Sequence, residues 1–196
     1  LKNINNFLFV LIIIVNLATL LQPLLPWIAN KFSKPVDVGL YQTDKPSKKD
    51  LANNKIIIPS IKLDKKINEG KNIAAANTGP WRLPYTSTPE EGGNTVIVGH
   101  RFSYVNPDAA SFYMLDGVNL KDKIYVVYDH KLYQYKVVDI KVVSPSEISV
   151  EAKTDKPRLT LYTCTPLWTA TDRLVIIAEP TGKVRPWLKR NDLYYF

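Results

Sequence analysis

The chain has 196 residues, of which 45% are hydrophobic and 22% charged, so it can form one folded domain with accessory segments and is not disordered overall. Its net charge of +8 suits an anionic membrane or wall surface, or a nucleic acid. The lysines are scattered along the sequence, however, and we find no basic helix and no nucleic-acid-binding motif. Nucleic acid is therefore not an expected partner.

The first thirty residues are far more apolar than the rest of the chain. Residues 7–28 are almost wholly apolar, and a helix of these 22 residues could cross a hydrocarbon core of about 30 Å. A cleaved signal peptide is the alternative, but only Lys2 is basic before the run and no clear Ala-x-Ala cleavage pattern follows it. Residues 1–30 are therefore predicted to form an N-terminal membrane anchor or signal.

A polar stretch separates this segment from the predicted folded domain. Residues 31–54 are loose and charged, which is typical of a tether between a membrane and a domain. The domain itself is expected over residues 55–181. It opens with an apolar run at 55–59 and an alternating polar and apolar run at 60–64, both typical of strands.

The rest of the domain is also predicted to consist of short strands separated by turns. Two runs on either side of Asp129-His130 predict a β-hairpin. Residues 144–156 are predicted to be a polar loop with one helical turn, and residues 182–196 form a basic and aromatic tail. At least seven short strands favour a barrel or sandwich over βαβ units, so the fold is expected to be mainly β. The further strands are expected at 95–100, 158–164 and 174–178, and the best short helix at 72–77.

Cys164, the only cysteine, ends one of these strands. A single cysteine cannot form an internal disulfide, so in an exported protein it is a reactive thiol, an intermolecular partner or a buried apolar residue. Arg173 opens the next strand nine residues later, and so short a connection places it near Cys164 across an antiparallel ladder. A nearby cation favours the nucleophilic thiolate, and a guanidinium could stabilise the oxyanion formed by its attack on a carbonyl.

His100 ends a third predicted strand, far from Cys164 in the sequence. A nucleophile and its base usually meet in space rather than in sequence, and an imidazole could protonate a departing amine and deprotonate an incoming one. Gly99 would allow the backbone to approach a neighbour closely. Alone, His100 could be a surface histidine and Arg173 a solvent-facing strand end. Together with Cys164 they predict a thiolate acyl-transfer site.

Metal and nucleotide chemistry are not expected. One cysteine and two histidines are too few for a zinc site, and the paired Glu90-Glu91 has no metal-ligand spacing. The sequence also contains neither of the main glycine-rich phosphate-binding patterns. No cofactor and no metal are predicted.

The segments around the three reactive residues resemble the sortases, membrane-anchored cysteine transpeptidases of bacterial cell envelopes. Residues 160–164, Thr-Leu-Tyr-Thr-Cys, are similar to the TLxTC signature of that family, and residues 173–175 are similar to the Arg-Leu-Val that follows it. Residues 91–101 resemble the segment that leads to the family's histidine. The resemblance extends over residues 55–180 and includes the N-terminal anchor.

The resemblance implies a sortase-type eight-stranded β-barrel with short connecting helices, preceded by a transmembrane helix. It implies that Cys164 is the nucleophile, His100 the acid and base, and Arg173 the stabiliser of the substrate carbonyl and oxyanion. The implied reaction cleaves a C-terminal LPxTG- or LPxTA-like sorting signal after its threonine. The attached surface protein then passes to an amine acceptor, which is a peptidoglycan precursor or a pilin lysine. The implied location is the cell membrane, with a single pass and an extracytoplasmic catalytic domain.

Several alternatives remain open at this stage. Tyr162 and the run 165–168 look more like class D or E sortases, and we find neither an Asp-Pro-Trp-like lid nor a C-terminal membrane run of the pilus-polymerising type. Water instead of an amine could resolve the thioester. An L,D-type transpeptidase would need its Cys and Arg two residues apart. The non-enzymatic alternative is a membrane-tethered β-barrel binding module in which Cys164 is merely buried.

Overall fold

A computed structural model describes residues 2–39, 51–103 and 110–186. The chain forms two compact units, Leu1–Ser33 and Lys34–Phe196. The first unit is helical, and Asn3–Phe32 is long and apolar enough to cross a membrane, with its apolar side chains exposed. A signal sequence has the same length and composition, so retention in a membrane stays a prediction. The elements of this unit are α1 (Lys2–Leu21), the 3-10 turn η1 (Gln22–Leu24) and α2 (Leu25–Phe32).

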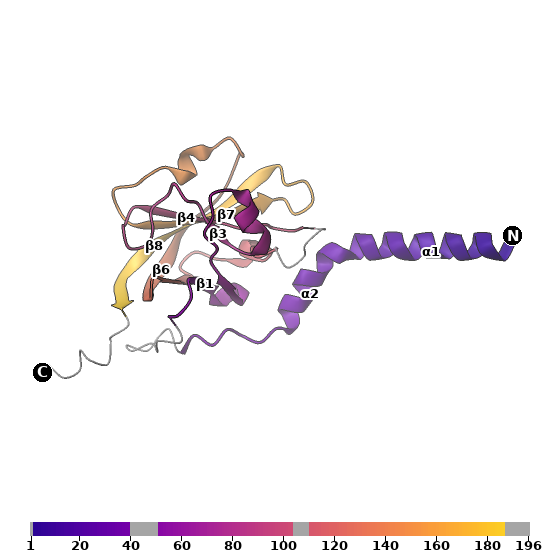
Figure 1. The fold of residues 1–196 in the computed structure, drawn as a ribbon, viewed down its shortest axis with the longest axis horizontal. Helices are drawn as coiled ribbons and strands as arrows, with labels where there is room; N and C mark the ends of the chain where they lie inside the picture. Colours follow the sequence, from indigo (N-terminus) through magenta and orange to yellow (C-terminus); the bar gives the residue numbers. More distant parts are fainter. Residues whose placement is uncertain (1, 40–50, 104–109, 187–196) are drawn as a thin grey trace, which may run out of the picture. The chain divides into compact units, whose positions relative to one another are not determined.

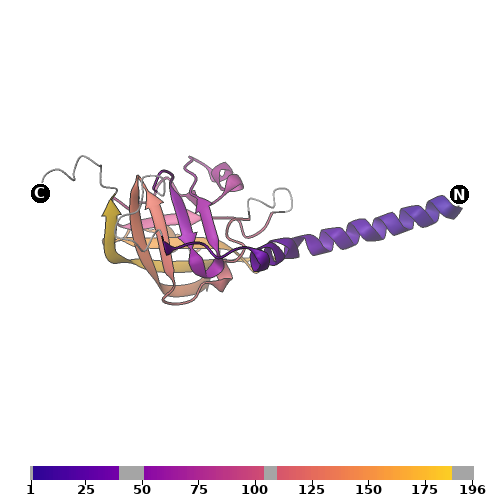
Figure 2. The same cartoon turned by 90° about the horizontal axis from the view of Figure 1, so that it is seen from below.

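The second unit is an eight-stranded sheet, which confirms the mainly β fold expected from the sequence. Figures 1 and 2 show the strands curling around one another instead of lying flat. Their order is β2-β1-β5-β6-β8-β7-β4-β3, and every neighbouring pair is antiparallel except β4 and β7, which run parallel. The strands are β1 (Lys55–Ile58), β2 (Leu63–Lys66), β3 (Trp81–Arg82), β4 (Asn94–Val98), β5 (Lys123–Tyr128), β6 (Lys131–Val143), β7 (Arg158–Thr165) and β8 (Asp172–Pro186).

Several connections contain short 3-10 turns, in agreement with the short connecting helices that the sequence predicts. The helix expected at 72–77 is the 3-10 turn η3, and its preceding residue Asn72 accepts a hydrogen bond from the backbone N–H of Ala74 at 3.1 Å. A side chain in this position satisfies an N–H that the turn itself leaves unpaired. The 3-10 turns of this unit are η2 (Pro59–Ile61), η3 (Ile73–Thr78), η5 (Leu115–Gly117) and η6 (Ile148–Glu151).

One hydrophobic core joins the strands that carry the candidate site. Ile97 of β4, Leu161 of β7 and Ile176 of β8 are fully buried in the same cluster. Deleting most of a side chain from such a close-packed core typically costs about 2–5 kcal/mol, because a cavity remains. The ends of these strands are therefore held on a rigid base.

The hairpin predicted around Asp129 and His130 is confirmed. β5 and β6 pair in register up to Tyr128 and Lys131, so the turn contains two residues. Both turn residues have positive φ values, 44° for Asp129 and 60° for His130. Two successive left-handed residues are typical of the tight turn whose twist matches that of paired strands.

The strand predicted at residues 60–64 is displaced towards the C-terminus. Pro59 begins the turn η2, and Lys62 adopts a left-handed conformation with φ of 55°. Proline has no N–H for a ladder, and a left-handed residue interrupts the extended backbone. β2 therefore begins only at Leu63.

The predicted tether ends earlier than expected. Leu51 is only 1% exposed and packs in a cluster with Ile57 and Tyr125. The end of the 31–54 segment therefore contributes to the core of the domain. Residues 40–50 of that segment lie outside the described residues.

The predicted tail begins later than expected. β8 continues past Gly182 to Pro186, because its last residues pair with the start of β6, where Lys131 lies opposite Pro186. Residues 187–196, the rest of that tail, lie outside the described residues.

Candidate active site

The ladder between β7 and β8 places Cys164 directly opposite Arg173. Residues that face each other in an antiparallel pair project their side chains to the same side of the sheet, with Cβ atoms about 4.5–5.5 Å apart. Both residues are half-buried. This arrangement confirms the expectation that the short connection brings Arg173 beside Cys164.

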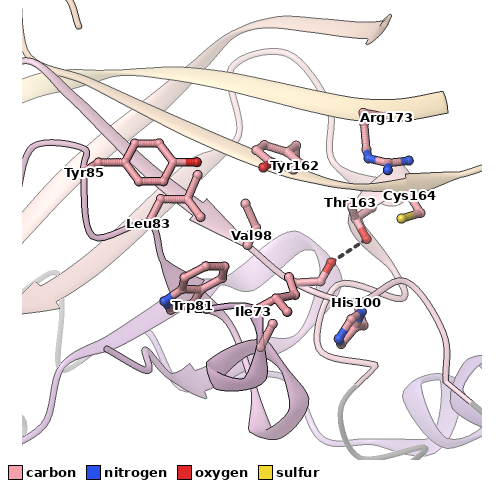
Figure 3. A pocket seen from close by; sticks show the side chains of 12 residues that line it. Ile73, Trp81, Leu83, Tyr85, Val98, His100, Tyr162, Thr163, Cys164 and Arg173 are labelled. Atoms are coloured by element: carbon pink, nitrogen blue, oxygen red, sulfur yellow. Dashed lines mark hydrogen bonds between the residues drawn. The ribbon is translucent and has the colours of Figure 1, made fainter. Parts of the chain in front are cut away.

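The parallel pairing of β4 with β7 brings His100 to the same edge of the sheet. Val98 pairs with Tyr162, and His100 and Cys164 each follow two residues later. Beyond the strand end, the N–H of Gly99 donates to the carbonyl of Tyr162 at 3.3 Å. The hydroxyl of Thr163 donates to the carbonyl of Gly99 at 2.8 Å, the bond drawn in Figure 3. The residues just before His100 and Cys164 are thus bonded to each other.

Gly99 is required at this junction by close packing. A Cβ atom on Gly99 would lie 2.6 Å from Oγ of Ser111 and 2.9 Å from ring atoms of Phe112. Real Cβ atoms do not approach neighbours so closely, so a larger residue would push the backbone away from these side chains. The predicted close approach at Gly99 is confirmed. It determines the position of the backbone from which the side chain of His100 extends.

His100 is held from its ring and from its backbone. Its Nε2 lies 3.1 Å from Oδ1 of Asn77 in η3, and its carbonyl accepts a hydrogen bond from the N–H of Phe112 at 3.1 Å. When Nε2 carries the ring proton and donates it to Asn77, Nδ1 is the nitrogen left for acid–base chemistry. Asn77 was not predicted as a site residue, because its only feature in the sequence was its place in a predicted helix.

Backbone carbonyl groups hold the guanidinium of Arg173 in place. Its Nη1 donates to two carbonyl oxygens of the connection that precedes it, those of Ala170 at 3.2 Å and Asp172 at 3.0 Å. Within the described residues, no Asp or Glu side chain forms a salt bridge with Arg173. The guanidinium is therefore oriented by neutral acceptors, and its positive charge is not neutralised by a carboxylate.

All three residues line one cavity of about 320 Å³. Figure 3 shows Cys164, Arg173 and His100 towards one end of it, with apolar side chains and two tyrosines further away. A concave apolar site with a few convergent polar groups is the usual form of a ligand-binding pocket. The remaining lining residues are Ile73, Ala76, Trp81, Leu83, Tyr85, Val98, Gly99, Tyr162 and Thr163.

The described residues contain no group of three or more His, Cys, Asp or Glu side chains that could hold a metal ion. The second histidine, His130, lies in the β5–β6 turn, where its Nδ1 is 3.1 Å from the carbonyl oxygen of Leu51. It is therefore part of the packing of the turn and not of the cavity.

Comparisons with known proteins agree with this arrangement. A sortase-domain family model matches residues 56–181. Sortase A of Listeria monocytogenes serovar 1/2a is 28% identical over 131 residues, which are 67% of this chain and 57% of that protein. The chain thus covers little more than half the length of this curated relative.

Solved sortase structures have the same fold. Sortase C-1 from Actinomyces oris is 30% identical with a TM-score of 0.60, over 66% of this chain and 73% of that one. The Clostridium perfringens Sortase D5 transpeptidase is 27% identical with a TM-score of 0.59, over 66% and 79% of the two chains. Similarity thus extends to sortases of classes A, C and D, and the expected class D or E type stays a prediction.

The matched segment contains His100, Cys164 and Arg173, and it covers well over half of the chain. The family model and the solved structures indicate the same family. This chain belongs to the sortase family.

Proposed function

We propose that this chain is a membrane-anchored cysteine transpeptidase that cleaves a C-terminal sorting signal and joins the cleaved protein to an amine. The observation that carries the proposal is the meeting of Cys164, Arg173 and His100 at one cavity in a sortase domain. A thiol, an imidazole and an unneutralised guanidinium are the groups that acyl transfer through a thioester requires.

In the first half-reaction, the thiolate of Cys164 attacks the carbonyl carbon of the threonine in an LPxTG- or LPxTA-like signal. A C–S bond forms, and the carbonyl oxygen becomes an oxyanion beside the guanidinium of Arg173. The oxyanion then collapses and the C–N bond breaks. His100 donates a proton to the departing amine, which leaves the protein attached to Cys164 as a thioester.

In the second half-reaction, the nitrogen of an incoming amine attacks the thioester carbon. His100, now neutral, takes the proton that this nitrogen loses, and the C–S bond breaks to return the thiolate. A new amide bond joins the surface protein to the acceptor. Arg173 stabilises the oxyanion in both halves, and one such donor is typically worth about 100–1000-fold in kcat.

The cavity supports an extended peptide as the substrate. Its walls away from Cys164 are mainly apolar, which suits the apolar residues of a Leu-Pro motif. Clostridium perfringens sortase C, 30% identical to this chain, was solved with the C-terminal cell wall sorting motif. The proposed acceptor is the amine of a peptidoglycan precursor or of a pilin lysine.

The helical unit supports a location at the cell membrane. Asn3–Phe32 is long and apolar enough for a single pass. The sorted proteins and their acceptors belong to the cell envelope, so the catalytic domain is placed outside the cytoplasm. The net charge of +8 would attract the domain to anionic envelope polymers.

Mass spectrometry of the full chain in detergent micelles tests the proposal. The chain is mixed with LPxTG- and LPxTA-type peptides, with and without an added amine. We expect an adduct on Cys164 with the mass of the peptide up to its threonine, and its release as the amide of the added amine. Release only as the free acid would identify a hydrolase. No adduct, with a thiol that does not react with iodoacetamide, would instead support the binding-module alternative.

A further inference from the structure

Three side chains from distant segments are joined by hydrogen bonds along the cavity wall. Tyr162 lies two residues before Cys164 in β7, and Tyr85 lies at the other end of the cavity in Figure 3. The hydroxyl of Tyr162 in β7 donates to Oε1 of Glu151, and the hydroxyl of Tyr85 donates to Oε2 of the same carboxylate, both at 2.6 Å. Both tyrosines line the cavity. Figure 3 shows their hydroxyl groups pointing towards one another across its wall. We call these three residues the Tyr–Glu–Tyr clamp.

The two bonds of the clamp are strong ones. Hydrogen bonds from a hydroxyl to a carboxylate are typically 2.5–2.7 Å long and about twice as strong as those between neutral groups. Burial, followed by the hydrogen bond to Glu151, raises the pKa of Tyr85 to about 12 and raises the pKa of Tyr162 further. Both phenols therefore remain protonated donors at any physiological pH.

The carboxylate is the fixed member of the clamp. Asn94, only 1% exposed, donates through Nδ2 to the carbonyls on either side of Glu151, those of Val150 at 2.9 Å and Ala152 at 3.0 Å. The hydroxyl of Thr160 in turn donates to Oδ1 of Asn94 at 2.7 Å. The backbone around Glu151 is thus bonded to the interior of the sheet.

Tyr85 is the member that the clamp holds. It lies in the connection between β3 and β4, and 62% of its surface is exposed, so its ring is only partly packed and only partly shielded from water. A large exposed side chain without a fixed partner would sample several rotamers. The bond to Glu151 selects one of them, in which the ring forms part of the cavity wall.

From this geometry we propose that Glu151 is a positioning residue for substrate binding, which holds the ring of Tyr85 as a wall of the peptide cavity. The proposal rests on the proposed function, because the ligand is the sorting-signal peptide. Within the described residues, the side chain of Glu151 bonds to the hydroxyls of Tyr85 and Tyr162 and not to Cys164, His100 or Arg173. Its loss should therefore weaken peptide binding and leave the chemical step unchanged.

The test compares Glu151→Ala, Glu151→Gln and Tyr85→Phe with wild type, using the full chain in detergent. The control is Glu147→Gln, an exposed carboxylate in the same connection that bonds to Ser149 and to no other side chain among the residues that the structure describes. Transfer of the peptide to an amine is measured over a range of peptide concentrations. Alkylation of Cys164 by iodoacetamide is measured in parallel, because so small a reagent needs no cavity wall.

We expect Glu151→Ala to raise KM roughly tenfold, the scale of one lost hydrogen bond to a charged group, with kcat and alkylation unchanged. Tyr85→Phe should raise KM similarly. Glu151→Gln should recover part of the loss, because its amide oxygen can still accept from one tyrosine. A wild-type KM in Glu151→Ala would overturn the proposal. An equal fall in kcat and in alkylation would also overturn it, since that pattern indicates general damage to the site.

A second variant and a second measurement allow the proposal to be tested even if the first experiment fails. If Glu151→Ala does not fold, Tyr85→Phe decides, because this exposed side chain contributes little to the core. If wild type forms no thioester, the proposed function fails, and equilibrium binding of a fluorescent sorting-signal peptide decides the clamp separately. Binding about tenfold weaker in Tyr85→Phe supports it, and equal binding overturns it.

Discussion

The two ends of the cavity are built in different ways. At one end, backbone pairing between β4, β7 and β8 fixes the positions of His100, Cys164 and Arg173. At the other end, hydrogen bonds between side chains of three separate segments hold the tyrosine wall. Backbone register cannot change without unfolding the sheet, whereas a side-chain bond can be gained or lost by one substitution. In the proposed function, the chemistry thus takes place on the rigid part, and the peptide is recognised by the part that can change.

This contrast makes a general prediction about mutations. Changes at the Cys164 end should lower kcat while the fold and peptide binding remain. Changes at the clamp end should alter KM or stability while the reactivity of Cys164 remains. The predictions below test this division. It would be contradicted if a change at the Cys164 end altered KM, or if a change in the clamp altered the reactivity of Cys164.

The largest effect is expected for Cys164→Ser. The hydroxyl of serine is a much weaker nucleophile than a thiolate, and this site was not built to activate it. Adduct formation and transfer should fall below detection in the mass-spectrometric assay. Peptide binding and the thermal unfolding midpoint should match wild type, because the side chains have similar size. Residual turnover at more than about 1% of wild type in Cys164→Ala, which has no nucleophile at this position, would show that another residue is the nucleophile.

Arg173→Ala should have the next largest effect. Removing an oxyanion donor typically costs about 100-fold or more in kcat, or about 2.7 kcal/mol. Arg173→Lys keeps the charge but not the planar group held by the Ala170 and Asp172 carbonyls, so it should recover only part of the loss. For both variants, kcat and KM for peptide transfer are measured separately, and the fall is expected in kcat. A fall of less than about tenfold in Arg173→Ala would contradict the assigned role.

The difference between the two ends also explains what the sequence could predict. The pairing of Cys164 with Arg173 was predictable, because a short connection between two strands leaves antiparallel neighbours as the simplest arrangement. The parallel pairing of β4 with β7 was not, because alternating apolar residues show that a strand exists but not which strand lies beside it. Residue types, strand ends and family resemblance therefore grouped His100 with Cys164, and the structure showed the strand pairing that brings them together.

The clamp left no trace in the sequence for a related reason. Tyr85 and Glu151 are 66 residues apart, and a hydrogen bond between distant side chains produces no local pattern. Asn77, 23 residues from His100, was missed in the same way. Strand boundaries failed where single residues overrode the pattern, as Pro59 and Lys62 did before β2. Local periodicity predicts elements, and only their packing creates sites.

Asn94→Ala should affect stability more than chemistry. The substitution removes the amide that bonds to Val150, Ala152 and Thr160, and the buried groups of Val150 and Thr160 lose this partner. An unsatisfied buried polar group costs about 1–3 kcal/mol, so the free energy of unfolding in urea should fall by at least that amount. Asn119→Ala is the control, because this exposed side chain bonds to nothing but the carbonyl of Gly117 in the described part of the chain. Equal stability of the two variants would mean that the backbone around Glu151 is held by packing alone.

The smallest expected effect is on stability at alkaline pH. The pKa of Tyr85 is raised to about 12, and that of Tyr162 is raised as well, by burial and then by the bond to Glu151. An unfolded tyrosine has a pKa of about 10, so the folded state keeps these protons more tightly. The stabilisation is fully present below pH 10 and is lost as the pH rises towards 12 and beyond.

Tyr162→Phe removes one of these titrating groups and should make the pH dependence shallower. We expect the free energy of unfolding in urea to fall less between pH 9 and pH 11 in Tyr162→Phe than in wild type. Tyr135→Phe is an informative comparison, because burial alone is the main cause of its raised pKa and Glu151 has no part in it. Tyr135→Phe should also flatten the profile but leave KM unchanged, whereas Tyr162→Phe should raise KM as well. If both variants raised KM equally, the cavity wall would depend on general core packing and not on the clamp.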